Sequence, residues 1–285
     1  MRLSFHSFFA LAALLLSASR VHAQDKNFYV FLCLGQSNME GFPGIPEEEK
    51  AWSDARFQVL AAVDFPQQER TQGNWYTAVP PLCRPNSGLS PADYFGRTLV
   101  AHLPPGVRVG ILSVAVAGAK IEVFDPAALD AYATTTAPWL KEIIATYGGD
   151  PYRHLVKMAR AAQQAGVIRG ILLHQGESNS NDPEWPAKVK KIYENLLNDL
   201  DLRAAEVPLL VGELVPADQK GACASMNAII GRLPQTIPTA HVVSSTGCEG
   251  RPDHLHFTPA GYRELGKRYA EVMLPLLSVL PAPAE

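Results

Sequence analysis

Residues 28–39 of the chain read FYVFLCLGQSNM. The apolar run from Phe28 to Leu34 predicts a buried β-strand, and the glycine, serine and asparagine that follow it predict a turn. A strand that is apolar on both faces is typical of a parallel sheet with helices on both sides. The stretch therefore favours an α/β fold in which Ser37 lies at the carboxyl end of the first strand.

Four further apolar runs predict strands, at residues 107–116, 168–173, 208–214 and 240–244. Helical patterns separate these runs. Several of them open with a capping residue followed by proline, as at Ser90-Pro91, Asp150-Pro151, Asp182-Pro183 and Thr258-Pro259. Because strands that alternate with helices indicate βαβ units, we expect a three-layer α/β/α sandwich around a mainly parallel five-stranded sheet.

The composition of the 285-residue chain excludes several classes of protein. Hydrophobic residues make up 47% of the sequence, which is enough to fill a sizeable core and excludes wholesale disorder. The formal net charge of −3 argues against a nucleic-acid partner, because such proteins need an excess of Lys and Arg to neutralise phosphates. We therefore expect a soluble globular protein that carries a site.

The segment 1–23 predicts a secretory signal peptide. Arg2 supplies a positive charge, the apolar run from Phe8 to Leu16 is too short to span a membrane, and Val21-His22-Ala23 fits a cleavage site. We therefore expect a secreted or periplasmic protein, with no membrane insertion after the signal is removed and a single domain over residues 24–285.

Four cysteines are too few for a disulfide scaffold. Cys33 lies in the first predicted strand and is expected to be a buried thiol, whereas Cys83, Cys223 and Cys248 lie in loop-like or helix-start contexts. Export would permit a Cys223–Cys248 disulfide, although sequence alone does not fix the connectivity. The chain has no Cys-x-x-Cys motif and no His/Cys cluster with zinc spacing, so we expect neither a metal nor another cofactor.

Polar residues follow several of the predicted strands at their carboxyl ends. In an open parallel sheet these ends border the crevice where ligands bind, so the segments that follow them are expected to meet there. The segments are Gly35-Gln36-Ser37, Ala117-Gly118-Ala119, His174-Gln175-Gly176-Glu177 and, after a longer loop, Asp253-x-x-His256. Together they contain the parts of a hydrolase that forms an acyl-enzyme intermediate.

Each of these parts has an expected role. Ser37 is the candidate nucleophile and His256 the base that takes its proton. Asp253, three residues before His256, can reach the imidazole Nδ1–H across the turn. Glu177 is a second candidate for this orienting role. The developing oxyanion would be held by the backbone N–H groups of Ser37 and Gly118 and by the side-chain amide of Gln175.

Three of these segments resemble motifs of the SGNH-hydrolase superfamily: the one that contains Ser37, the one that contains Gln175, and Asp253-x-x-His256. More narrowly, they are similar to the carbohydrate esterases that include acetylxylan esterases (carbohydrate esterase family six) and sialate O-acetylesterases. The resemblance implies a flavodoxin-like α/β/α fold, no metal, and removal of acetyl groups from sugar hydroxyls. The chain departs from the broad superfamily in having Gln175, rather than an asparagine, in the block that begins at His174, and in lacking paired glycines around Gly118.

The expected partner is therefore an acetylated carbohydrate, either a glycan such as acetylated xylan or an O-acetylated sialic acid. The alternatives are a lipid or thioester hydrolase of the same superfamily and a non-catalytic carbohydrate-binding protein. Residues 35–89 show little periodicity and are expected to form a wall of the active site. In this segment Trp52, Trp75 and Tyr76 could either pack internally or form a platform for sugar rings.

Overall fold

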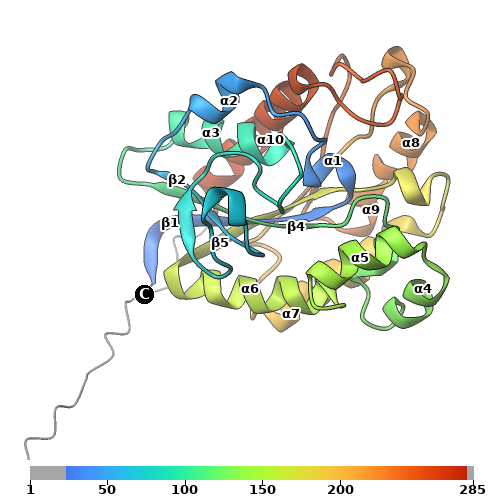
Figure 1. The fold of residues 1–285 in the computed structure, drawn as a ribbon, viewed down its shortest axis with the longest axis horizontal. Coiled ribbons are helices and arrows are strands. Elements are labelled where there is room, and N and C mark those ends of the chain that lie inside the picture. The colour runs from blue at the N-terminus through green and yellow to red at the C-terminus, as the bar shows by residue number, and fades with distance from the viewer. Residues whose placement is uncertain (1–23, 281–285) are drawn as a thin grey trace, which may run out of the picture.

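The structure of the protein is a computed structural model that describes residues 24–280. The predicted signal peptide, residues 1–23, lies outside the described residues. A sheet runs through the centre of the fold (Figure 1). It has seven strands in the order β3-β2-β4-β1-β5-β6-β7. The strands are β1 (Asp25–Gly35), β2 (Phe57–Leu60), β3 (Trp75–Thr77), β4 (Arg108–Ala115), β5 (Gly166–His174), β6 (Leu209–Gly212) and β7 (Ala240–Val243).

The sheet is parallel except for β3, which pairs antiparallel with β2 at one edge. This arrangement confirms the α/β class and the five expected strands, but the expected strand count is wrong. The two additional strands, β2 and β3, lie in the segment 35–89. They are four and three residues long, too short to give a clear periodic pattern, and are held in place by pairing with β4 and with each other.

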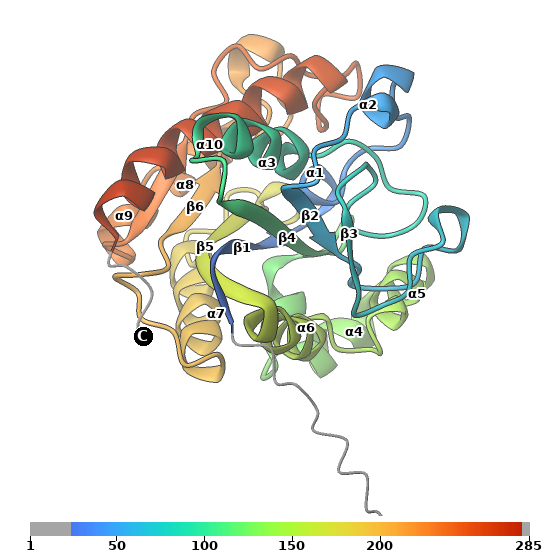
Figure 2. The same cartoon turned by 90° about the vertical axis from the view of Figure 1, so that its left-hand side faces the viewer.

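Two pairs of long helices cover the two faces of the sheet (Figure 2). Helices α3 (Pro91–His102) and α10 (Pro259–Val279) lie on one face, and α6 (Pro151–Ala165) and α7 (Trp185–Asp199) lie on the other. Alternate side chains of β1 enter the two cores: Val30 and Leu32 pack with the α6 side, and Phe31 packs with the α3 side. The apolar first strand is therefore buried on both faces, as its sequence indicates.

Shorter helices fill the connections. The α-helices are α1 (Ser37–Glu40), α2 (Glu47–Ala51), α4 (Leu129–Thr135), α5 (Pro138–Thr146), α8 (Asn227–Ile230) and α9 (Leu233–Thr236). Single 3-10 turns occupy Pro66–Gln68, Ile121–Phe124, Glu177–Asn179, Ala217–Gln219 and Ala224–Met226. Within residues 24–280, no helix is long and apolar enough to cross a membrane.

Three of the four expected helix starts are found. Ser90 caps α3 in a capping box, and the side chains of Asp150 and Thr258 accept backbone N–H groups at the starts of α6 and α10. The fourth is wrong, because α7 begins at Trp185 rather than at Pro183. Asp182 instead accepts the N–H of Glu184.

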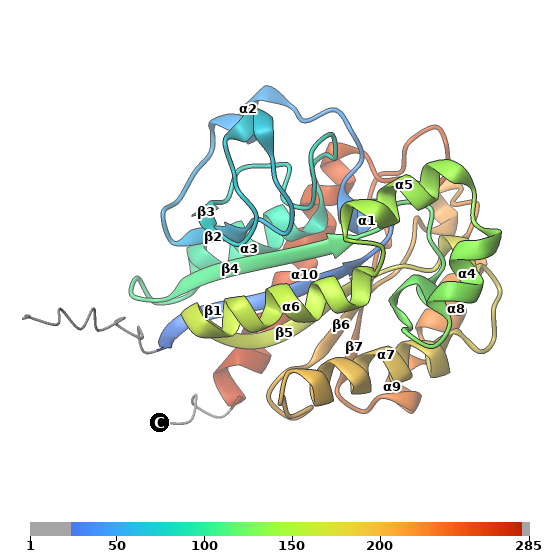
Figure 3. The same ribbon diagram turned by 60° about the horizontal axis from the view of Figure 1, so that its bottom comes forward.

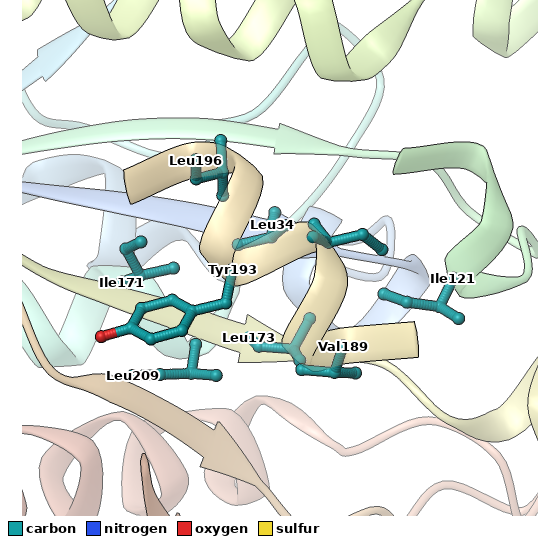
Figure 4. Close-up of a pocket in the computed structure, with 9 residues that line it drawn as sticks. Leu34, Ile121, Ile171, Leu173, Val189, Tyr193, Leu196 and Leu209 are labelled. Atoms are coloured by element: carbon teal, nitrogen blue, oxygen red, sulfur yellow. The ribbon is translucent and has the colours of Figure 1, made fainter. Parts of the chain in front are cut away.

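The core beneath α7 is closely packed. Figure 4 shows the mainly apolar side chains that pack there. The void that they surround has a volume of about 10 Å³, which is too small to hold a substrate. All four cysteines are free thiols, so the Cys223–Cys248 disulfide that the sequence permits is not formed. Cys223 packs against the core on the α6 side of the sheet, whereas Cys248 is buried in the core on the α3 side. The two thiols therefore belong to different cores.

Candidate active site

The carboxyl ends of the three central strands lie at one level. Gly35, the last residue of β1, pairs with Ala115 of β4 on one side and His174 of β5 on the other. Gly35 has a φ of 151°, and a Cβ atom added to it would lie 2.1 Å from the His174 carbonyl oxygen. Only glycine therefore allows β1 and β5 to approach so closely, and this approach brings Ser37 next to the loops that follow β4 and β5.

Ser37, His256 and Asp253 form a hydrogen-bonded relay. The Nε2 atom of His256 lies 2.9 Å from the Oγ atom of Ser37, and its Nδ1 atom lies 2.9 Å from Oδ2 of Asp253. The His256 ring packs on Phe42 with 4.7 Å between ring centroids. Three predicted residues that are up to 219 positions apart in the chain are thus brought together in the order that nucleophilic catalysis requires.

The environment of Asp253 favours its ionised form. Partial burial by itself would raise the pKa of this carboxyl, but hydrogen bonds from the backbone N–H groups of His256 and Leu255 and from the imidazole outweigh it. The pKa of Asp253 is therefore lowered, and the group can stay charged beside an imidazolium.

Two backbone N–H groups are available to a ligand at this site. Those of Ser37 and Gly118 have no acceptor among the described residues, whereas the neighbouring Ala117 N–H donates to the Oε2 atom of Glu40. Gly118 has a φ of 71°, which favours glycine. Both residues line one cleft, so the two N–H groups are placed where an oxyanion would need them.

The third expected oxyanion donor is placed differently. Gln175 is only 1% exposed and is not among the residues that line the cleft. Its Nε2 atom donates to Gln36, to the Ala119 carbonyl and to Asn179, while its Oε1 atom accepts the Trp185 indole N–H. Contrary to the expectation, Gln175 holds the loops of the site together from beneath instead of facing a ligand.

Glu177 does not contact the imidazole of His256. Its Oε1 atom accepts a hydrogen bond of 2.6 Å from Asn38 and lies 4.0 Å from Nε2 of His174. The Oε2 atom is buried and has no hydrogen-bond partner among the described residues. Burial raises the pKa of Glu177 to about 7. Of the two acids considered from the sequence, Asp253 is the one within hydrogen-bonding distance of the base.

Asn38 is a supporting residue that the sequence reasoning missed. Its Nδ2 atom donates to Glu177 and to the Leu255 carbonyl, and its Oδ1 atom accepts from the Phe257 N–H and the Tyr262 hydroxyl. This single buried amide connects the loops after β1, β5 and β7. The only signal in the sequence is its position directly after Ser37 in the first block.

The cleft above Ser37 has a volume of about 360 Å³, within the range of small-molecule sites. It is lined by Gln36, Ser37, Ala117, Gly118, Trp139, Glu177, Ser178, Leu255 and His256. Among the described residues, no three His, Cys, Asp or Glu side chains are grouped so that they could hold a metal ion.

The aromatic residues of segment 35–89 do not line this cleft. The Arg97 guanidinium lies over the Trp52 ring at 4.5 Å, and Trp75 packs against Phe28 with 4.7 Å between ring centroids. The Tyr76 hydroxyl accepts the Thr71 N–H. Of the two alternatives left open for these rings, packing against neighbouring side chains is the one found. Gln36 and Ser37 are the residues of segment 35–89 that line the cleft, and the indole that lines it is Trp139 of α5.

Comparison with known proteins identifies the family. A family model described as carbohydrate esterase, sialic acid-specific acetylesterase, matches residues 27–275. The chain belongs to this family. It is therefore a carboxylic ester hydrolase that removes O-acetyl groups from carbohydrates, and the resemblance found in the sequence is confirmed.

Solved structures share the fold of this acetylesterase. A protein of Arabidopsis thaliana has a TM-score of 0.65 and 19% identity, with 89% of this chain and 99% of that chain covered. A carbohydrate acetylesterase from Xanthomonas citri has a TM-score of 0.61 and 20% identity, over 85% of this chain and 54% of that one. NanS has a TM-score of 0.61 and 19% identity, over 90% and 99%.

Proposed function

We propose that the acetylesterase is a serine hydrolase in which Ser37 is the nucleophile. The observation that carries the proposal is the relay of two 2.9 Å contacts from Ser37 through His256 to Asp253. A serine hydroxyl is a weak nucleophile until a base takes its proton, and His256 Nε2 is in place to do so.

The reaction proceeds in two halves. Ser37 Oγ bonds to the acetyl carbon while its proton passes to His256, and the carbonyl oxygen becomes an oxyanion between the Ser37 and Gly118 N–H groups. Collapse of this intermediate breaks the ester bond, and His256 returns the proton to the departing sugar oxygen. Water then attacks the acetyl-enzyme with His256 as the base, which releases acetate and restores Ser37. Asp253 accepts the Nδ1–H throughout and stabilises the imidazolium.

Replacement of the nucleophile tests this mechanism. Ser37→Ala should lower kcat on an aryl acetate by at least about 10⁴-fold, and an organophosphonate should label the wild-type protein at Ser37. Ser178→Ala is the matched control, because Ser178 also lines the cleft but its hydroxyl donates to the Gly118 carbonyl. Its loss should stay below about tenfold, as expected for one local hydrogen bond. Full activity of Ser37→Ala would rule the mechanism out.

We further propose that the substrate is an acetylated sugar without charge, such as a unit of acetylated xylan. Of the residues that line the cleft, Glu177 and His256 carry the ionisable side chains, and Asp253 lies behind His256. The ionised Asp253 carboxylate, and Glu177 once it loses its proton, disfavour a negatively charged substrate such as an O-acetylated sialic acid. Acetate release should therefore be faster from acetylated xylan than from acetylated pectin or sialic acid. Faster release from the sialic acid would reverse this assignment.

The preferred length of the acyl group can be tested with a series of esters. A series of esters from acetyl to octanoyl should be cleaved fastest at acetyl, whereas a preference for octanoyl would favour a lipid hydrolase.

The proposed export of the protein predicts that the mature chain is found in the periplasm or medium and begins near Gln24, which N-terminal sequencing would check.

A further inference from the structure

Trp139 is an exposed aromatic side chain at the mouth of the cleft. Its residue surface is 53% exposed, and the other large apolar residues exposed in the described part of the chain are Leu255 and Val279. Both Trp139 and Leu255 line the cleft that contains Ser37, whereas Val279 ends α10. Exposed apolar surface gathered in a cleft is typical of a ligand-binding site.

The other three tryptophans of the chain are engaged in packing. Trp185 is fully buried and donates its indole N–H to Gln175, Trp75 packs edge-on against Phe28, and Trp52 lies under the Arg97 guanidinium. The Trp139 indole has no hydrogen-bond, aromatic or cation partner among residues 24–280. Its exposed ring is therefore available to a ligand.

The local structure fixes the indole next to the reaction centre. A Cβ atom added to Gly118 would lie 2.5 Å from Cη2 of Trp139, so the ring edge rests on the backbone that supplies an oxyanion N–H. Trp139 lies in the first turn of α5, directly after Pro138, and Leu140 and Ile144 anchor this helix in the core. Helix α5 thus places the ring beside Gly118, in the same cleft as Ser37.

We propose that the face of the Trp139 indole is the platform on which the acetylated sugar ring rests during deacetylation. A pyranose ring has hydroxyl groups around its rim and apolar C–H groups on its faces, and a flat indole matches such a face. Because the platform touches Gly118, a sugar on it would present its ester to the oxyanion groups. This inference rests on the proposed function and names Trp139 as a specificity-determining residue.

The test compares a sugar ester with an ester that has no ring to stack. Trp139→Ala should raise KM for acetylated xylotriose roughly 10- to 100-fold, the range expected for the loss of a central tryptophan contact. The fold loss of kcat/KM on ethyl acetate should be at least about tenfold smaller than the fold loss on acetylated xylotriose. Trp139→Phe should recover part of the loss, and Trp52→Ala, which removes a tryptophan outside the cleft, should behave like the wild type.

Binding to a variant without the nucleophile separates this inference from the mechanism. Ser37→Ala and Ser37→Ala/Trp139→Ala are titrated with acetylated xylotriose by calorimetry, and the double variant should bind at least about tenfold more weakly. Equal binding, or equal kinetic losses on xylotriose acetate and ethyl acetate, would overturn the platform. An active Ser37→Ala would instead overturn the mechanism.

Discussion

The loops after β7 and after β5 each bring a carboxyl group towards the cleft, and the two groups lie in opposite environments. The Asp253 side chain is 37% exposed and accepts three hydrogen bonds from its own turn, so its pKa is lowered. The Glu177 side chain is 7% exposed, has one oxygen without a partner, and has its pKa raised to about 7. Solvation and local donors, more than proximity to the cleft, therefore determine which acid can support a positive imidazole.

The largest effect should come from neutralising the two acids in turn. Asp253→Asn should lower kcat/KM on an aryl acetate by about 10³- to 10⁴-fold, because the amide disfavours the tautomer that holds Nδ1–H towards residue 253. Glu177→Gln should cost less than about tenfold, because the amide oxygen can still accept from Asn38. Equal losses in the two variants would contradict the difference in role.

Glu177 should also make stability depend on pH. Its pKa is about 7 in the folded protein and 4.5 for a free side chain. The folded protein therefore binds the carboxyl proton more tightly than the unfolded chain does, and it loses stability as pH rises from about 4.5 to 7 and above. Glu177→Gln removes the penalty. Relative to the wild type, the variant should gain about 3 kcal/mol in unfolding free energy between pH 5 and pH 8, measured by urea denaturation.

The comparison between variant and wild type is needed because other buried groups titrate in the same range. Burial lowers the pKa of His174 to about 3, which costs stability as pH falls below 6.5, and raises the pKa of Asp93 to about 7. Both contributions are common to the two proteins and cancel in the difference. A difference that does not change with pH would show that Glu177 is ionised in the folded state at no cost.

Asn38→Ala removes the amide that joins the two loops. The Tyr262 hydroxyl and the Glu177 carboxyl would lose a buried partner, so the unfolding free energy should fall by about 2 kcal/mol. Activity should fall about 10- to 30-fold, since the loop that carries His256 loses its tether through Leu255. Asn38→Asp keeps the acceptor for Tyr262 but sets a second buried carboxyl against Glu177, so it should be no more stable and no more active than Asn38→Ala. An active, stable Asn38→Ala would show that the loops are positioned independently.

The smallest effect concerns the cysteines beside the two loops. The Cys223 thiol donates to the Glu177 carbonyl, Cys248 precedes the Asp253 turn, and neither forms a disulfide. Adding dithiothreitol should therefore change Tm by less than about 1 °C, whereas breaking a disulfide usually costs about 2–4 kcal/mol and several degrees. A clear drop in Tm would mean that the loops are covalently linked.

The sequence is informative where the structure depends on nearby residues. The apolar runs predict five of the seven strands, and the Asp253-x-x-His256 spacing predicts a contact within one turn. By contrast, β2 and β3 are fixed by pairing with distant strands, and their own sequences are too short to indicate it.

The same limit applies to the site. Gln175 has the residue type of an oxyanion donor, but its partners Gln36, Asn179 and Trp185 come from several segments and keep it buried. Trp139 carries no local signal either, because its place above Gly118 depends on how α5 packs against the core.

Helices α4 and α5 lie beyond the carboxyl end of β4 in Figure 3, in the stretch of chain between β4 and α6. Helix α5 contributes Trp139 to the cleft, while Ser37, Gly118 and His256 come from the loops after β1, β4 and β7. Mutation and selection can therefore change the surface around Trp139 separately from the hydrolytic residues. Substitutions in α4 and α5 can alter which sugar is accepted in descendant proteins, while the hydrolytic centre is inherited unchanged.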